Sequence, residues 1–188
     1  MGVKRQPGAT DRLFFALRPD AAAAAQADTL AQQLVQQHGL HGRPLGAERY
    51  HVTLAFLGDH AGLSDELLDQ ATAAGDALTQ PAFDVAFDEV RSFARGQGVP
   101  LVLCGRGAGV AGLERLAAGL RAGLEPFGLA ERRTYRAHLT LLRDDRALAP
   151  QAVPPLAWRA TEFMLVRSLI GQARHEVLRR WPLAGPAA

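Results

Sequence analysis

The chain has 188 residues, 48% of them hydrophobic, a formal net charge of +2 and a single cysteine. This length and hydrophobic content suffice for one domain with a substantial core, and no apolar run reaches the roughly eighteen residues that a membrane span needs. The small net charge argues against a protein that grips long duplexes through many phosphates. Because Cys104 has no partner for an internal disulfide and the N-terminus lacks an apolar secretion segment, we expect a cytoplasmic protein.

Apolar patterning predicts four elements in the first part of the chain. Leu13–Leu17 is a short apolar run typical of a buried strand. Asp20–His38 places apolar residues at helical spacing and is followed by a glycine, which commonly ends a helix. A second strand is expected around His51–Leu54, and a second helix from an N-cap at Ser64 to about Leu78.

The middle of the chain repeats this kind of pattern. Phe83–Phe93 alternates apolar and polar residues as a half-buried strand does. Pro100–Cys104 is a second apolar strand, and Val110–Phe127 keeps helical spacing up to a glycine. His138–Leu141 predicts a further buried strand.

The C-terminal part is predicted to be a loop followed by a hairpin. Three prolines, at 150, 154 and 155, indicate a loop within the domain. Thr161–Ile170 and Arg174–Trp181 are expected to be two strands joined around Gly171 and Gln172.

Two tetrapeptides of the same form, His51–Leu54 and His138–Leu141, lie 87 positions apart. In each half of the chain a strand and a helix precede the tetrapeptide, so the sequence reads as strand, helix, His-Thr strand, twice over. This duplication predicts two related lobes with a cleft between them. The alternative, two unrelated lobes that share a common βαβ-like unit, stays open.

Each tetrapeptide presents one imidazole and one hydroxyl on the same face of its strand. Side chains alternate along a strand, so each histidine emerges with the threonine two positions later while the apolar residues point into the core. One imidazole can deprotonate a nucleophile while a second protonates a leaving oxygen. Two hydroxyls can stabilise the charge on the oxygens of a tetrahedral anion. The pattern therefore indicates phosphodiester chemistry without a metal, with one histidine neutral and the other protonated near neutrality.

At this point the sequence resembles a known family. The segments His51–Gly58, His138–Arg143, Arg12–Ala16 and Thr161–Phe163 are similar to those of the RNA 2′,3′-cyclic phosphodiesterases in the LigT-like 2H phosphoesterase superfamily. The resemblance covers the chain from about Arg12 to Trp181. It implies a bilobal α+β fold, with two pseudo-symmetric antiparallel sheet lobes, outer helices and a central groove. We expect a single domain over 1–188, with a flexible N-terminus at 1–11.

The resemblance also implies a reaction and roles. A terminal 2′,3′-cyclic phosphate on RNA would be opened to a 2′-phosphate, and some relatives also join RNA ends through a reversible 2′-5′ linkage. By this resemblance His51 is the general acid, His138 is the base that activates water, and Thr53 and Thr140 hold the phosphate. The expected partners are RNA with cyclic phosphate ends, tRNA fragments or cyclic nucleotides. No membrane, metal or cofactor is expected, and the expected state is a monomer.

Other residues near the motifs are weaker candidates for substrate binding. Arg143 follows Thr140 by three positions and faces the phosphate only if the strand ends or twists near Leu142. Phe14 or Phe56 is a candidate for stacking on a base, although core packing explains each of them as well. The family often has Phe-x-Pro where this chain has residues 135–137, and His175 stands where a tyrosine is frequent; both changes bear on substrate preference.

Three alternatives remain at this stage. Gly107–Gly112 is a literal G-x-G-x-x-G, but no acidic residue follows at the position that a dinucleotide site needs. His38 and His41 have metal-ligand spacing without further ligands. The third alternative is a noncatalytic RNA-end or nucleotide-binding protein that uses the same groove.

Overall fold

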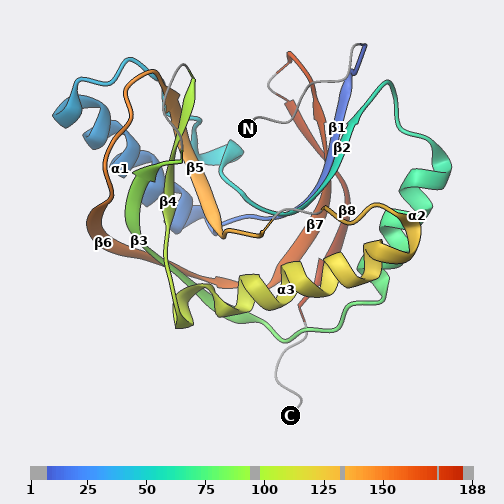
Figure 1. The fold of residues 1–188 in the computed structure, drawn as a ribbon. Helices are drawn as coiled ribbons and strands as arrows, with labels where there is room; N and C mark the ends of the chain where they lie inside the picture. The colour runs from blue at the N-terminus through green and yellow to red at the C-terminus, as the bar shows by residue number, and fades with distance from the viewer. Residues whose placement is uncertain (1–7, 94–97, 132–133, 173, 184–188) are drawn as a thin grey trace.

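The structure is a computed structural model that describes residues 8–93, 98–131, 134–172 and 174–183 (Figure 1). Its elements in chain order are β1 (Asp11–Leu17), α1 (Ala21–His38), η1 (Ala47–Arg49), β2 (Val52–His60), α2 (Asp65–Asp76), β3 (Phe83–Ser92), β4 (Val99–Cys104), α3 (Ala108–Leu124), η2 (Glu125–Phe127), β5 (His138–Asp144), β6 (Gln151–Ala160), β7 (Glu162–Leu169) and β8 (Arg174–Pro182).

The strands of the described segments form one antiparallel sheet in the order β6-β3-β4-β5-β2-β1-β7-β8. Four strands lie on each side of the β2–β5 junction, where Val52 pairs with Leu139. Figure 1 shows the two groups of strands on opposite sides of the molecule, with α3 running across below them. The α+β class is confirmed. A division into two lobes stays a prediction, because the two groups share one hydrogen-bonded sheet.

The helices cover the face of the sheet that carries the main core. Asp20 caps α1 by accepting a hydrogen bond from the N–H of Ala23 at 2.8 Å, and α1 ends at Gly39 in the left-handed conformation. α1 packs against β5 and β6, and α3 packs against β3 and β2. The core therefore continues through both groups of strands, and α3 alone contributes several fully buried leucines: Leu113, Leu116, Leu120 and Leu124.

The predicted loop is correct for Pro150, which precedes β6, but wrong for Pro154 and Pro155, because residues 151–160 form β6. β6 lies at the edge of the sheet and pairs with β3, and its register shifts between the Phe87–Leu156 and Glu89–Ala152 pairs. Pro154 and Pro155 lie inside this irregular stretch. A proline has no N–H to donate, so strands tolerate it at an edge or a bulge, where no ladder bond is lost.

The C-terminal hairpin is confirmed, as β7 and β8 pair antiparallel. Gly171 adopts a φ of 85°, and the N–H of Gln172 donates to the carbonyl of Leu169 at 3.1 Å. The second predicted helix is also confirmed, because the Ser64 side chain accepts from the N–H of Leu67 as an N-cap. Of the predicted flexible segment 1–11, Asp11 belongs to β1 and is buried, and residues 1–7 lie outside the described part.

Packing explains two glycines of the G-x-G-x-x-G segment. A Cβ on Gly112 would lie 2.1 Å from the Phe83 ring, and a Cβ on Gly109 would lie 2.6 Å from the carbonyl oxygen of Ala86. Both neighbours belong to β3, so the glycines let α3 approach that strand closely. The motif therefore has a structural explanation that involves no cofactor.

None of the helices within the described ranges has both the length and the apolar character needed to cross a bilayer.

Candidate active site

The two His-Thr motifs meet at the junction between the two groups of strands. Val52 and Leu139, which directly follow the two histidines, are paired across β2 and β5 and fully buried. The strand alternation turns the histidines and threonines to the opposite face, where all four side chains are half-buried: His51, Thr53, His138 and Thr140. The pairing of Val52 with Leu139 thus sets both motifs side by side.

The two imidazoles make equivalent hydrogen bonds. Nδ1 of His51 lies 2.8 Å from the carbonyl oxygen of Arg49, and Nδ1 of His138 lies 2.7 Å from that of Arg136. A carbonyl oxygen only accepts, so the partner assigns the proton to Nδ1 in each ring. Each Nε2 is then the atom left for proton transfer, as a base when neutral and as an acid when the ring is charged.

Burial lowers the pKa of both histidines below the ordinary value of 6.5. For His51, the positive charges of Arg18, His138 and Arg49 lower the pKa further. The neutral form of both rings is therefore favoured near neutrality in the free protein. The expectation of one neutral and one protonated imidazole used unperturbed pKa values, and it stays a prediction. A bound phosphate would shift both pKa values upward, because a nearby anion favours the charged ring.

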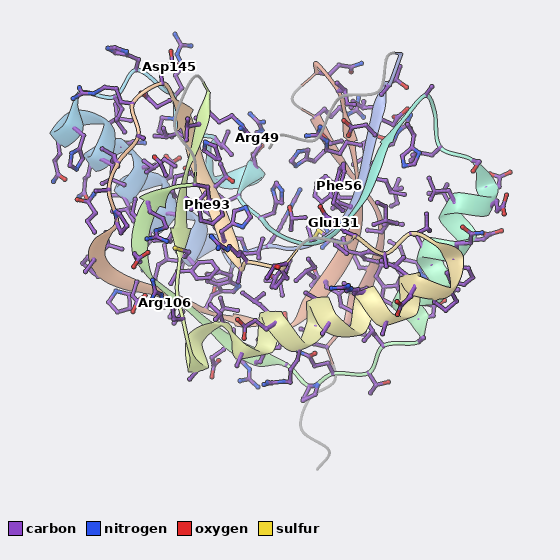
Figure 2. All side chains as sticks on the ribbon, viewed as in Figure 1. Arg49, Phe56, Phe93, Arg106, Glu131 and Asp145 are labelled. Carbon is purple, nitrogen blue, oxygen red and sulfur yellow. The ribbon has the colours of Figure 1, made fainter. Side chains whose placement is uncertain are left out.

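A cavity of about 570 Å³ joins residues from the two motifs. Thr53 of the first motif and His138 of the second line it, together with side chains of α3. Figure 2 shows Phe93 on the β3–β5 side of the gap between the strand groups and Phe56 on the β1–β2 side. The ring of Phe93 contacts the His138 ring edge-on, with centroids 4.8 Å apart. One residue of each motif therefore lines the same cavity, whereas His51 and Thr140 are not among its lining residues.

Arg143 lies on the same face of the sheet as Thr140 because β5 is irregular. Thr140 pairs with Val102 and Arg143 pairs with Pro100, and the register shifts between these two pairs. Cross-strand partners share a face, and Val102 and Pro100 are two positions apart on β4. The shift supplies the departure from a regular strand on which the prediction for Arg143 depended. Its guanidinium is exposed and donates to the carbonyl of Gly98 at 3.1 Å.

Phe14 and His175 pack against His51. The Phe14 ring stacks on the His51 ring with centroids 5.1 Å apart, and His175 meets His51 edge-on at 5.2 Å. Phe14 is only 4% exposed, so it supports the imidazole from within the sheet, and its role in substrate binding stays a prediction. Burial and the charges of His51, Arg49 and Arg18 lower the pKa of His175 to about 4. His175 therefore lies beside His51.

Sequence reasoning missed two arginines beside His51. Arg18 and Arg49 lie near enough to lower the pKa of His51, and the buried Nε of Arg49 has no hydrogen-bond partner in the described part of the chain. Figure 2 shows Arg49 at the gap between the two groups of strands. Such cations attract an anionic substrate. The sequence feature that could have identified Arg49 is its position two residues before His51.

The arginines of β8 form ion pairs with acidic side chains. Arg179 pairs with Asp76, Arg180 with Glu162 and Arg174 with Glu176. Arg132 and Arg133 lie outside the described residues.

The other sequence candidates do not contribute to the cavity. His38 ends α1, and the backbone N–H of His41 donates to Asp144. Cys104 is half-buried, and burial raises the pKa of its thiol to about 11, which disfavours the reactive thiolate. Within the described residues, no group of three or more His, Cys, Asp and Glu side chains could hold a metal ion.

Comparisons with known proteins agree with this geometry. Residues 18–170 match the family model of the 2′-5′ RNA ligase superfamily. The chain is 31% identical over 182 residues to a protein named RNA 2′,3′-cyclic phosphodiesterase from Escherichia coli (strain K12), covering 92% of this chain and 96% of that relative. The structure is similar to E. coli LigT in its apo form, with a TM-score of 0.74 and 31% identity over 94% of this chain and 99% of that one. It is also similar to E. coli LigT complexed with 3′-AMP, with a TM-score of 0.71 and 30% identity over 93% and 99% of the two chains.

Proposed function

Because the chain belongs to the 2′-5′ RNA ligase superfamily, we propose that it hydrolyses RNA 2′,3′-cyclic phosphate ends to 2′-phosphates. The observation that carries the proposal is the cavity lined by both Thr53 and His138, one residue from each repeated motif. The relative from E. coli is named for this substrate, and a LigT structure was solved with 3′-AMP. The proposed substrate class is therefore a nucleotide whose one phosphate bridges its 2′ and 3′ oxygens.

In the proposed reaction the two histidines act on opposite sides of the phosphorus. Nε2 of His138 takes a proton from water as the water oxygen forms a bond to phosphorus. Nε2 of a protonated His51 gives its proton to the ribose 3′-oxygen as the bond between that oxygen and phosphorus breaks. The product keeps its phosphate on the 2′-oxygen. The imidazoles exchange roles when the reaction runs backward.

The remaining residues stabilise charge around the phosphate. The hydroxyls of Thr53 and Thr140 donate to non-bridging oxygens, and these hydrogen bonds strengthen as negative charge develops. Arg143 lies on the same face as Thr140, and its guanidinium has N–H donors whose geometry suits phosphate oxygens. No metal or cofactor enters these steps. We further propose that tRNA fragments and cyclic nucleotides are substrates, and that the protein acts as a monomer in the cytoplasm.

The pH dependence of the reaction should reflect the lowered histidine pKa values. The kcat/KM profile reports the free protein, in which both pKa values lie below 6.5, so we expect a bell-shaped curve with its maximum on the acid side of that value. The kcat profile reports the complex, where the phosphate charge raises both pKa values, and its maximum should lie at higher pH. Initial rates with 2′,3′-cAMP across the pH range give both profiles. A kcat/KM maximum above about pH 7 would contradict the assignment of the two histidines as acid and base with lowered pKa values.

The direct test is a product assay in EDTA on an oligoribonucleotide with a 2′,3′-cyclic phosphate end. We expect full turnover to a 2′-phosphate, identified by chromatography against 2′- and 3′-phosphate standards. A 3′-phosphate product would overturn the assignment of the leaving oxygen. Binding of the oligoribonucleotide without turnover would overturn the enzyme proposal in favour of a noncatalytic RNA-end binder.

A further inference from the structure

Two arginines beside His51 have no acidic partner within the described segments. Arg18 and Arg49 are both half-buried, and in these segments neither forms an ion pair with a carboxylate. The Nε of Arg49 is buried there without a hydrogen-bond partner. A partly buried cation without a partner loses hydration and gains no compensating contact. The two arginines therefore favour an anion that comes from outside the chain.

The pairing of β1 with β2 places Arg18 on the face of the sheet that carries His51. Leu17, the last residue of β1, pairs with Val52 in an antiparallel register. Continuing this register by one position sets Arg18 opposite His51, and cross-strand partners share a face. Arg49 lies two residues before His51, at the gap between the two groups of strands (Figure 2), and its carbonyl oxygen accepts from Nδ1 of His51. Both cations are therefore neighbours of His51.

The phosphate that reacts does not account for these two cations. In the proposed reaction the two threonine hydroxyls and Arg143 hold that phosphate, and His51 donates a proton to the ribose 3′-oxygen. The ribose therefore lies on the His51 side of the phosphorus. In an RNA strand the next phosphate is attached to the 5′-carbon of the same ribose, one sugar away from the cyclic phosphate. Arg18 and Arg49 lie on the side of the site where this second phosphate would be.

We propose that Arg18 and Arg49 bind the phosphodiester on the 5′ side of the terminal nucleotide, so that the site prefers the end of an RNA strand to a free cyclic nucleotide. The inference rests on the proposed function and specifies its substrate class. The N–H groups of an arginine side chain form paired hydrogen bonds with phosphate oxygens, so two arginines can enclose one phosphodiester. This contact is made by binding alone and adds no chemical step.

The test compares substrates that differ at the 5′-oxygen of the terminal adenosine. In 2′,3′-cAMP this oxygen is a free hydroxyl. In the dinucleotide ApA with a 2′,3′-cyclic phosphate end it carries a phosphodiester, and in the methylphosphonate analogue of that dinucleotide the linkage is neutral. We expect the wild-type kcat/KM to be about tenfold higher for the phosphodiester dinucleotide than for its neutral analogue, because hydrogen bonds to a charged group are the stronger ones. The difference should lie in KM, because the second phosphate is remote from the bonds that form and break.

Variants of the two arginines assign the preference to them. Arg18→Gln and Arg49→Gln should each lower the ratio of the two kcat/KM values to about threefold or less, and the double variant should bring it to about one. Both dinucleotides undergo the same reaction, so this ratio cancels any change in the pKa of His51. Arg18→Lys and Arg49→Lys keep the charge and should keep part of the preference. Arg115→Gln is the matched control, because it removes an exposed arginine of α3 and should leave the ratio unchanged.

The outcomes distinguish the second phosphate site from the proposed function. A wild-type ratio of about one, or a preference that persists in the double glutamine variant, would overturn the second phosphate site and keep the proposed function. A gain found only with 5′-phosphorylated 2′,3′-cAMP and absent from the dinucleotide would assign the arginines to a terminal phosphate and overturn the preference for a strand. A wild-type protein that turns over none of these substrates would overturn the proposed function itself.

Discussion

His51→Ala and His138→Ala should each lower kcat/KM for a 2′,3′-cyclic nucleotide by about 10²-fold or more. Each replacement removes the Nε2 that donates or accepts a proton in the proposed reaction. Because the two imidazoles act in one step, the double variant should lose less than the product of the single losses. Steady-state rates on 2′,3′-cAMP for the three variants measure this directly.

The matched control is His41→Ala, which removes an exposed imidazole. The backbone N–H of His41 donates to Asp144, and this hydrogen bond is kept in the variant. This variant should keep wild-type rates. Thermal melting separates chemistry from folding, since His51 and His138 are half-buried and their replacement should shift the melting temperature only modestly. Loss of activity in only one of the two histidine variants would reject the acid-base pairing.

Strand periodicity was enough to predict which side chains of the two motifs face the core. The motifs alternate between the core and the opposite face because a regular strand turns every second side chain to one side, and Val52 and Leu139 are indeed fully buried. Arg143 shows the limit of this reasoning. Its face depends on a register shift in β5, and such a shift arises from pairing with β4, which lies more than thirty positions earlier in the chain.

The neighbours of His51 come together only through the tertiary fold. His175 reaches His51 because β7 and β8 follow β1 in the sheet, and Arg18 reaches it from the end of β1. The prolines of β6 led to the prediction of a loop for a related reason. Local sequence does not state which strand lies at an edge, and only at an edge or bulge are two successive prolines compatible with a strand.

Asp144→Ala should lower the free energy of unfolding by roughly 3 kcal/mol, the largest stability loss that we expect near the site. Asp144 ends β5 and is 4% exposed. Its carboxylate accepts backbone N–H bonds from His41 at 2.6 Å, Gly42 at 2.5 Å and Arg146 at 2.8 Å. Alanine leaves these three donors without their acceptor, and bonds to a charged group are among the stronger hydrogen bonds in proteins. Urea denaturation of both proteins near neutral pH measures the difference.

The dependence of this loss on pH identifies the carboxylate as its cause. Burial raises the pKa of Asp144, but the three backbone N–H bonds outweigh it and hold the pKa below the ordinary value of 3.8. The contribution is therefore complete above about pH 3.8 and declines as the pH falls through the lower pKa of the folded state, so wild type and variant should converge in acid. Asp145→Ala is the control, because the exposed Asp145 holds one backbone N–H, that of Gly98, and its removal should cost less than about 1 kcal/mol. A difference between wild type and Asp144→Ala that stays constant into strong acid would assign the loss to packing rather than to the charge.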